Sequence, residues 1–186
     1  MKILELSRSH KLLLMSAVVA FSIFGGTVIT PLSTALAVTC SGYGCDHLEP
    51  TATGCASGAV TKKTAYISIP WGTGTKNIGK VELRYSSLCD TAWSRMTIVD
   101  TYAVPGDPYT STVSVIRRNM QDDTEPAVYD TRTDRGLLYL DQNWSHQLYI
   151  PYSSSDPYSI RACGTLTREV NGQQFGPACT SYWTGV

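Results

Sequence analysis

The chain has 186 residues, of which 42% are hydrophobic, and its 15 basic and 15 acidic residues give no formal net charge. A nucleic-acid-binding protein gathers lysine and arginine on one face, whereas Arg117 and Arg118 form only a short basic pair. The composition therefore excludes nucleic acid as an expected partner.

The N-terminus has the three parts of a secretory signal peptide. Positive charges at Lys2, Arg8 and Lys11 precede an apolar run over residues 12–29, and a small-x-small motif ends at Ala37. We predict a signal peptide over residues 1–37 and a single secreted, disulfide-rich β domain over residues 38–186. The alternative is an uncleaved anchor, so membrane contact is expected only through this leader before cleavage.

All six cysteines follow the predicted leader. An exported chain with an even number of cysteines holds them as disulfides. No Cys-x-x-Cys pair is present, and we expect no metal and no cofactor. The predicted location is extracellular. The six residues are Cys40, Cys45, Cys55, Cys89, Cys163 and Cys179.

Residues 38–63 are expected to be irregular. Glycine and proline interrupt any period there, and three of the cysteines fall within this stretch. The segment has too little apolar content to pack alone, so disulfides are expected to tie it down.

From Lys63 onward, apolar residues alternate with polar ones in short runs separated by turn residues. This period of two, in runs rich in Val, Ile, Thr and Tyr, indicates half-buried strands. We predict an all-β fold, an antiparallel sandwich or barrel of about seven to nine short strands. The apolar positions of these strands are Ile67 and Ile69; Val81, Leu83 and Tyr85; Met96 and Ile98; Val113 and Val115; and Leu148, Ile150 and Tyr152. Residues 136–140 are apolar on both faces, which predicts a central, covered strand.

One hairpin can be predicted to the residue. Asn171-Gly172 is a strong hairpin signal between two strand-like runs. A three-residue loop over 170–172 would place Cys163 directly opposite Cys179, within the Cα separation that a disulfide tolerates. We therefore predict this bridge, and an edge strand at Pro177, which lacks an N–H group. The other four cysteines allow three pairings; we expect Cys40–Cys55 with Cys45–Cys89.

The spacing of the first cysteines and the sequence of the strand that follows them form a pattern over residues 40–96. This pattern resembles the YjfA-like family of secreted bacterial proteins, and the strands around Cys163 and Cys179 resemble the closing strands of that family. The chain departs from the family pattern at His47 and Glu49. The resemblance implies export and a disulfide-bonded domain, and it implies no reaction. The residues that carry it are Cys40, Cys45, Asp46, Pro50, Gly54-Cys55, the run Val81-Glu82-Leu83-Arg84-Tyr85-Ser86, Cys89, Trp93 and Arg95.

Asp46, His47 and Glu49 place two carboxylates and an imidazole on one loop. Calcium takes oxygen ligands from such loops, but the spacing fits no established calcium motif. We expect Asp46 to accept backbone N–H groups in an Asx-type turn and Glu49 to be solvated.

Glu82 and Arg84 lie two apart on the strand face opposite Val81 and Leu83. They could form a functional surface, a solvated face with a modest ion pair, or a brace in which Arg84 holds the cysteine-rich segment.

No catalytic motif is present. The predicted mature domain has two histidines, His47 and His146, and no Gly-x-Ser-x-Gly turn; we expect His146 to be an exposed loop residue. We therefore predict a secreted, non-catalytic binding domain whose partner is a protein or a cell-wall polymer. The candidate binding residues are Asp46, His47, Glu49, Arg84 and Trp93.

Two alternatives remain at this stage. An envelope-directed hydrolase would need one of the histidines in a pocket beside a carboxylate or serine. A protease inhibitor or effector would present a rigid loop, at residues 46–54 or 103–110. Binding would gain support if several exposed rings shared one sheet face, and the rings in question are Tyr102, Tyr109, Tyr152, Tyr158 and Trp183.

Overall fold

A computed structural model describes residues 37–100, 106–120, 127–151 and 157–184 of the chain. Contacts divide the chain into two units, Met1–Thr34 and Ala35–Val186, and the described residues all belong to the second. Apart from Ala37, the predicted signal peptide lies outside these residues and stays a prediction. No helix in the described ranges is long and apolar enough to cross a membrane.

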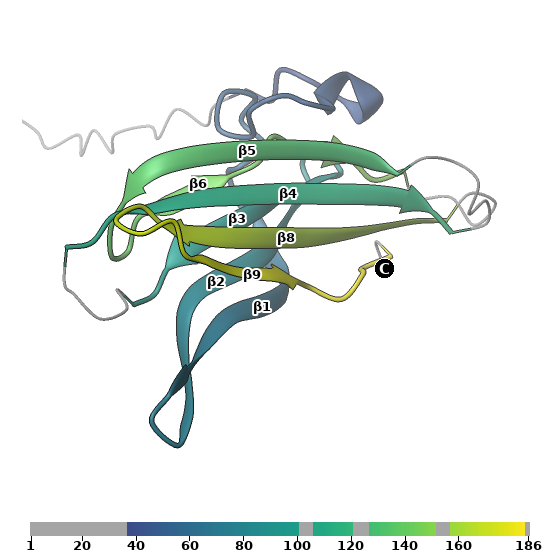
Figure 1. Cartoon of the computed structure of the whole chain (residues 1–186). Coiled ribbons are helices and arrows are strands. Elements are labelled where there is room, and N and C mark those ends of the chain that lie inside the picture. The colour runs from purple at the N-terminus through teal and green to yellow at the C-terminus, as the bar shows by residue number, and fades with distance from the viewer. Residues whose placement is uncertain (1–36, 101–105, 121–126, 152–156, 185–186) are drawn as a thin grey trace, which may run out of the picture. The chain divides into compact units, whose positions relative to one another are not determined.

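The described residues form nine strands and one short 3-10 helix, which confirms the predicted all-β class and strand number (Figure 1). The predicted irregular segment ends earlier than expected, since the first strand already begins at Val60. The elements are η1 Gly42–Cys45, β1 Val60–Trp71, β2 Gly74–Ser86, β3 Thr91–Ile98, β4 Tyr109–Asn119, β5 Val128–Leu137, β6 Gln142–Trp144, β7 Leu148–Tyr149, β8 Tyr158–Arg168 and β9 Gln174–Cys179.

The strands build two antiparallel sheets. The first has the order β1-β2-β3-β6, with β7 also pairing with β3, and the second has the order β5-β4-β8-β9. Strand β3 contacts β4 and β8 of the other sheet, and β2 contacts β8. In Figure 1 the second sheet lies in front of the first. The fold is therefore a sandwich rather than a closed barrel.

The core fills the space between the sheets. Val81 and Leu83 of β2, with Val113 and Val115 of β4, are fully buried, as the alternation predicted. The same alternation sends the neighbouring side chains of β2 to the outer face of the first sheet. That outer face carries the candidate site described below.

The prediction of a central strand over residues 136–140 is wrong. Strand β5 is an edge strand that ends at Leu137. Leu138, Tyr139 and Leu140 are exposed and lie in the connection to β6, where Leu140 has a φ of 69°. An apolar run indicates burial only on average, and here the backbone turns out of the sheet instead.

The β8–β9 hairpin joins Cys163 to Cys179 by a disulfide, as its predicted register required. The loop itself differs from the prediction. Backbone N–H of Arg168 bonds to the carbonyl of Gln173, so the loop covers residues 169–172 and is one residue longer. A β-bulge between Gly164 and Leu166 restores the register before the cysteines. Strand β9 is an edge strand, which confirms the expectation for Pro177.

The remaining cysteines pair differently from the prediction. The disulfides are Cys40–Cys45 and Cys55–Cys89, not Cys40–Cys55 and Cys45–Cys89. The 3-10 helix η1 turns the chain so that the Cα atoms of Cys40 and Cys45 are 5.2 Å apart. All four sulfurs lie within 4.8 Å of one another, so proximity alone does not select the pairing. The Cys55–Cys89 bridge ties residues 37–59, here called the N-terminal segment, to the β2–β3 turn.

Candidate functional site

Several large polar and aromatic side chains share the outer face of the first sheet. Cross-strand partners point to the same side of a sheet, and the register aligns Arg84 with Trp93 and then Arg95 with Trp144. Gln142 precedes Trp144 by two residues, so its side chain lies on the same face. The consecutive strands β2 and β3 and the distant strand β6 therefore contribute to one surface.

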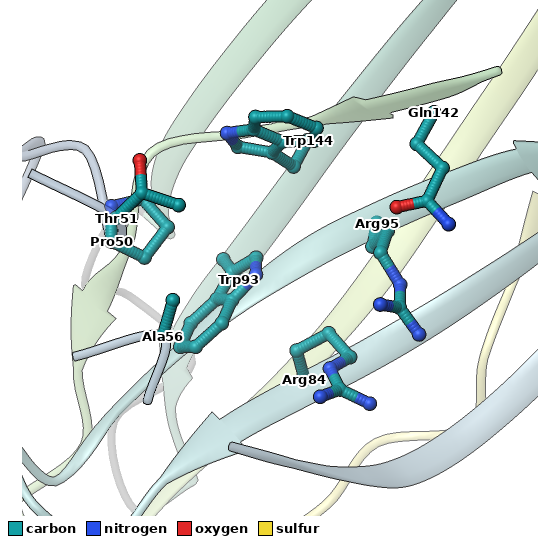
Figure 2. Close-up of a pocket in the computed structure, with 8 residues that line it drawn as sticks. All are labelled: Pro50, Thr51, Ala56, Arg84, Trp93, Arg95, Gln142 and Trp144. Carbon is teal, nitrogen blue, oxygen red and sulfur yellow. The ribbon is translucent and has the colours of Figure 1, made fainter. Parts of the chain in front are cut away.

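The N-terminal segment covers one end of this surface and closes it into a groove of about 210 Å³, here called the tryptophan groove. Figure 2 shows the segment on one side, the two arginines and Gln142 on the other, and the two indole rings between them. The described residues that line it are Pro50, Thr51, Ala56, Arg84, Trp93, Arg95, Gln142 and Trp144.

The two tryptophans have different positions in the groove. Trp93 is only 4% exposed and forms part of its floor. Trp144 is partly exposed, and its Nε1 donates a hydrogen bond of 2.5 Å to Oε1 of Glu49. The guanidinium of Arg132 lies 5.7 Å from the centre of the Trp144 ring. The Trp144 ring is thus held in place by contacts on its edge and near one face.

Glu82 is buried on the same face and neutralises Arg95. Nε and Nη2 of Arg95 donate to one carboxylate oxygen at 3.0 and 2.8 Å, and Thr61 donates to the other. Burial alone would raise the pKa of Glu82, but the bonds and charge of Arg95, with Lys80 and Thr61, hold that pKa below its ordinary value. Glu82 thus pairs with Arg95 rather than in a solvated pair with Arg84.

Arg84 acts as a brace, one of the three roles considered for it. Its Nη1 donates to Thr61 Oγ1 at 2.7 Å and its Nη2 to the carbonyl of Ala59 at 2.5 Å. Burial and the nearby charge of Arg95 lower the pKa of Arg84 from its ordinary value. The side chain therefore connects the end of the N-terminal segment to the sheet and also lines the groove.

Asp46 fastens the N-terminal segment to both sheets. Its carboxylate accepts the backbone N–H of Tyr149 at 2.5 Å and lies 2.9 Å from Nη1 of the buried Arg117. The expected Asx-type turn is therefore wrong, since the bonded N–H belongs to β7. Glu49 is not simply solvated either, because it binds Trp144 and also Arg132, at 3.0 Å. These partners occupy the oxygens that a cation would need.

His47 and His146 share one carboxylate. Their Nδ1 atoms lie 2.8 and 3.3 Å from Oδ2 of Asp130, which is 8% exposed. His146 lies between β6 and β7 with a side chain that is 40% exposed, as expected of an exposed loop residue. Its contact with Asp130 of β5 was not visible in the sequence. Within the described parts of the chain, no hydrogen bond joins either imidazole to a serine or threonine hydroxyl, and neither ring lines the groove.

The shared face of exposed rings that would have supported binding is not found among the described residues, which counts against that form of the binding prediction. Tyr109 and Trp183 are buried in the core, and Tyr158 is partly buried. Tyr102 and Tyr152 lie outside the described residues. On the outer face of the first sheet, Trp144 is the partly exposed ring, and the buried Trp93 lies in the groove floor.

Of the five predicted binding residues, Arg84 and Trp93 line the groove and Glu49 contacts its residue Trp144. Asp46 and His47 do not line it and bind Arg117 and Asp130 instead. The sequence analysis did not single out Trp144 and Gln142 for the site. The short run that contains them has no periodicity, and their position depends on the pairing of β6 with β3.

The sequence pattern of the family described as "protein of unknown function (DUF2690)" matches residues 43–140. The chain belongs to the DUF2690 family. The DUF2690 match includes the groove residues from Pro50 to Arg95 and stops before Gln142 and Trp144. Comparison with curated proteins and with solved structures finds no match for this DUF2690 chain.

Proposed function

We propose that the protein is a secreted, non-catalytic binding domain and that the tryptophan groove is its ligand site. The observation that carries this proposal is the joint presence of Trp93, Trp144 and Arg84 in one groove on a sheet face. Indole and guanidinium groups are the side chains that contribute most to binding when they are held in place. The proposed ligand is a component of the cell envelope, and a wall polymer fits the groove better than a folded protein.

The size of the groove supports binding rather than enclosure of a substrate. Its volume of about 210 Å³ is below the ~300–1,000 Å³ of pockets that surround a drug-sized molecule. One ring-sized unit of a longer ligand would fit, with the rest of the ligand extending along the outer face of the sheet.

The walls of the groove are ordered before any ligand arrives. Glu49 holds Trp144, Thr61 and Ala59 hold Arg84, and Glu82 holds Arg95. Side chains that are already immobilised lose little conformational entropy on binding. Such preorganisation favours a recognition role.

The two alternative functions have less support. A histidine-dependent hydrolase requires a nucleophile or an activated water at a pocket, whereas both imidazoles contact Asp130 away from the groove. An inhibitor requires a rigid loop that also projects for insertion. Asp46 and Glu49 hold residues 46–54 in place, but they do so by binding this loop to the sheets. The loop before β4 lies partly outside the described residues.

Export and the narrower family assignment belong to the same proposal. All six cysteines form disulfides in the described structure, a state typical of oxidising compartments. The YjfA-like resemblance agrees with a secreted domain of the DUF2690 family. Intact mass of the exported protein would test cleavage after Ala37.

The binding role can be tested by sedimentation with insoluble bacterial cell-wall material. Trp144→Ala is expected to lower the bound fraction at least tenfold, since stacking area and a fixed wall are both lost. Trp144→Phe keeps a ring and should retain part of the binding. The matched control is Trp71→Ala, which removes an exposed tryptophan at the β1–β2 hairpin, about 30 Å along β2 from Arg84.

Circular dichroism and thermal melts of each variant will show whether the fold is intact. The proposal is supported if folded Trp144→Ala loses wall binding while Trp71→Ala keeps it. Equal binding by both variants and the parent protein would reject the groove as the binding site. Loss on Trp71→Ala alone would move the site to the hairpin.

A further inference from the structure

We propose that the tryptophan groove recognises an acidic saccharide, with the sugar ring against Trp144 and its anionic group on Arg84. This inference rests on the proposed binding function and specifies the chemistry of its ligand. The anionic group is a carboxylate, as in a uronic acid, or a phosphate ester, as in a sugar-phosphate wall polymer. Both groups present anionic oxygen acceptors that a guanidinium can bind in a bidentate way.

The first argument is the charge of the groove. None of the described residues that line it is acidic, whereas Arg84 and Arg95 are both cationic. The adjacent Glu82 carboxylate is taken by Arg95 and lies 3.4 Å from Nζ of Lys80. One carboxylate thus faces several cations, and an excess of positive charge remains on the groove side of β2.

The second argument is the unused hydrogen-bonding capacity of Arg84. Its two bonds within the described chain go to neutral oxygens, the hydroxyl of Thr61 and the carbonyl of Ala59. No carboxylate in the described residues pairs with it. Because a guanidinium carries five N–H donors in a rigid fork, donors remain for an anion, and these two contacts already fix the direction of the fork.

The third argument favours a saccharide over a peptide. An extended peptide is recognised by main-chain hydrogen bonds to a free strand edge. Strand β3, which carries Trp93 and Arg95, is paired on both sides, and the edge strand at the groove is β6, which has only three residues. The groove therefore offers little free main chain to a peptide and presents mainly side chains. These side chains match a substituted sugar ring. The flat indole can contact the C–H face of the sugar, the Gln142 amide can bind hydroxyls, and the guanidinium can bind an acidic group.

The zero net charge of the chain limits this attraction to the groove. A basic stripe that follows a long polyanion is not present in the sequence, so the affinity should be set by one or two acidic sugar units. Short oligomers are accordingly the appropriate probes, and added salt should weaken binding only moderately.

The experiment is isothermal titration calorimetry on the purified protein expressed from the full-length chain. The probes are a short oligogalacturonate, its fully methyl-esterified form, a short sugar-phosphate oligomer and an oligoglutamate peptide. The methyl ester is the matched neutral ligand, because it keeps the sugar rings and removes the charge. The peptide carries the charge without the sugar.

Three variants separate charge recognition from structural damage. Arg84→Gln removes the proposed anion ligand and is expected to weaken binding of the acidic oligomer about tenfold or more. Gln142→Glu adds a negative charge at an exposed position without removing a brace, and should weaken binding by a similar factor even if Arg84→Gln folds poorly. The control is Arg135→Gln, which removes an exposed cation from β5 of the other sheet and should leave binding unchanged.

The inference is supported if at least one acidic oligomer binds, the methyl ester binds at least tenfold more weakly, and the two groove variants lose affinity while the control does not. Preference for galacturonate or for the sugar phosphate identifies the acidic group. Equal affinity for the methyl ester, with no effect of either groove variant, rejects charge recognition but leaves wall binding through Trp144 intact. Equal affinity for oligoglutamate rejects the saccharide. If no probe binds, and Trp144→Ala still binds cell walls, both the inference and the proposed site are wrong.

Discussion

The indole nitrogen of Trp144 donates a hydrogen bond to Glu49 across 95 positions of the sequence. The bond connects β6, at the edge of the first sheet, to the N-terminal segment. Each of these elements is short and forms little of the core, so each depends on the other for its position. The orientation of the groove wall is therefore coupled to the attachment of the segment.

Glu49→Ala is expected to destabilise the fold by about 1–2 kcal/mol, because it leaves the Trp144 N–H without its acceptor in a partly buried position. Loss of the partly exposed ion pair with Arg132 adds little. Urea denaturation will measure the change. Glu49→Gln keeps a neutral acceptor and should lose less than half as much; equal losses in both variants would mean that the charge, not the hydrogen bond, is what matters.

Glu82 makes the stability of the domain depend on pH. The pKa of Glu82 is lower in the folded protein than its ordinary value of 4.5, owing to Arg95, Lys80 and Thr61 acting against burial. A carboxyl with a lowered folded-state pKa stabilises the fold above its unfolded-state pKa, and this contribution is lost as the pH falls through the folded-state pKa.

Unfolding free energy should therefore fall as the pH is lowered from about 5 towards 3. Glu82→Gln should be less stable at pH 7, because Arg95 loses its partner, and should show a shallower decline below pH 5. Urea titrations at several pH values measure both. Parallel curves for the parent and the variant would show that other carboxyls account for the acid sensitivity.

The two N-terminal disulfides should differ in their effect on stability. Cys55–Cys89 closes a loop with a sequence separation of 34, and Cys40–Cys45 one with a separation of 5. Loop-closure entropy predicts losses of about 4 and about 2 kcal/mol for the respective paired Cys→Ser variants. Denaturation of the two double variants tests the order, and non-reducing peptide mapping tests the pairing. Finding Cys40 linked to Cys55 would contradict the structure.

Gly164→Ala should disturb the contact between the two sheets. A Cβ at this position would lie 2.8 Å from Cγ2 of Val81 and 3.0 Å from Cε of Met96, so one of these core side chains must move. Overpacking of this kind costs about 1–3 kcal/mol. The control is Gly44→Ala, where a Cβ meets no atom within 4 Å. If thermal melts show the same stability for Gly164→Ala and the parent, the sheets are less tightly packed here than described.

The sequence by itself determined the strand pattern and one of the three disulfides. Alternation of apolar residues at Val81 and Leu83, and at Val113 and Val115, follows from the geometry of a single strand, which sends successive side chains to opposite faces. The Cys163–Cys179 pair was predictable because a hairpin connects neighbours in sequence. Even there, the sequence did not reveal the longer loop or the β-bulge that compensates for it. The loop has one extra residue and the bulge has another, so the pairing of Cys163 with Cys179 is the same with both as with neither.

Arg84 and Trp93 were also named from the sequence as binding candidates, Arg84 from the alternation along its strand and Trp93 as one of the residues that carry the family resemblance. Only the tertiary structure placed Trp144 and Gln142 beside them, through the pairing of β6 with β3. It also decided the pairing of the first four cysteines, whose sulfurs lie within 4.8 Å of one another. These features depend on which distant segments meet, and that is a property of the packed sheets, while periodicity and turn residues report only on the local backbone.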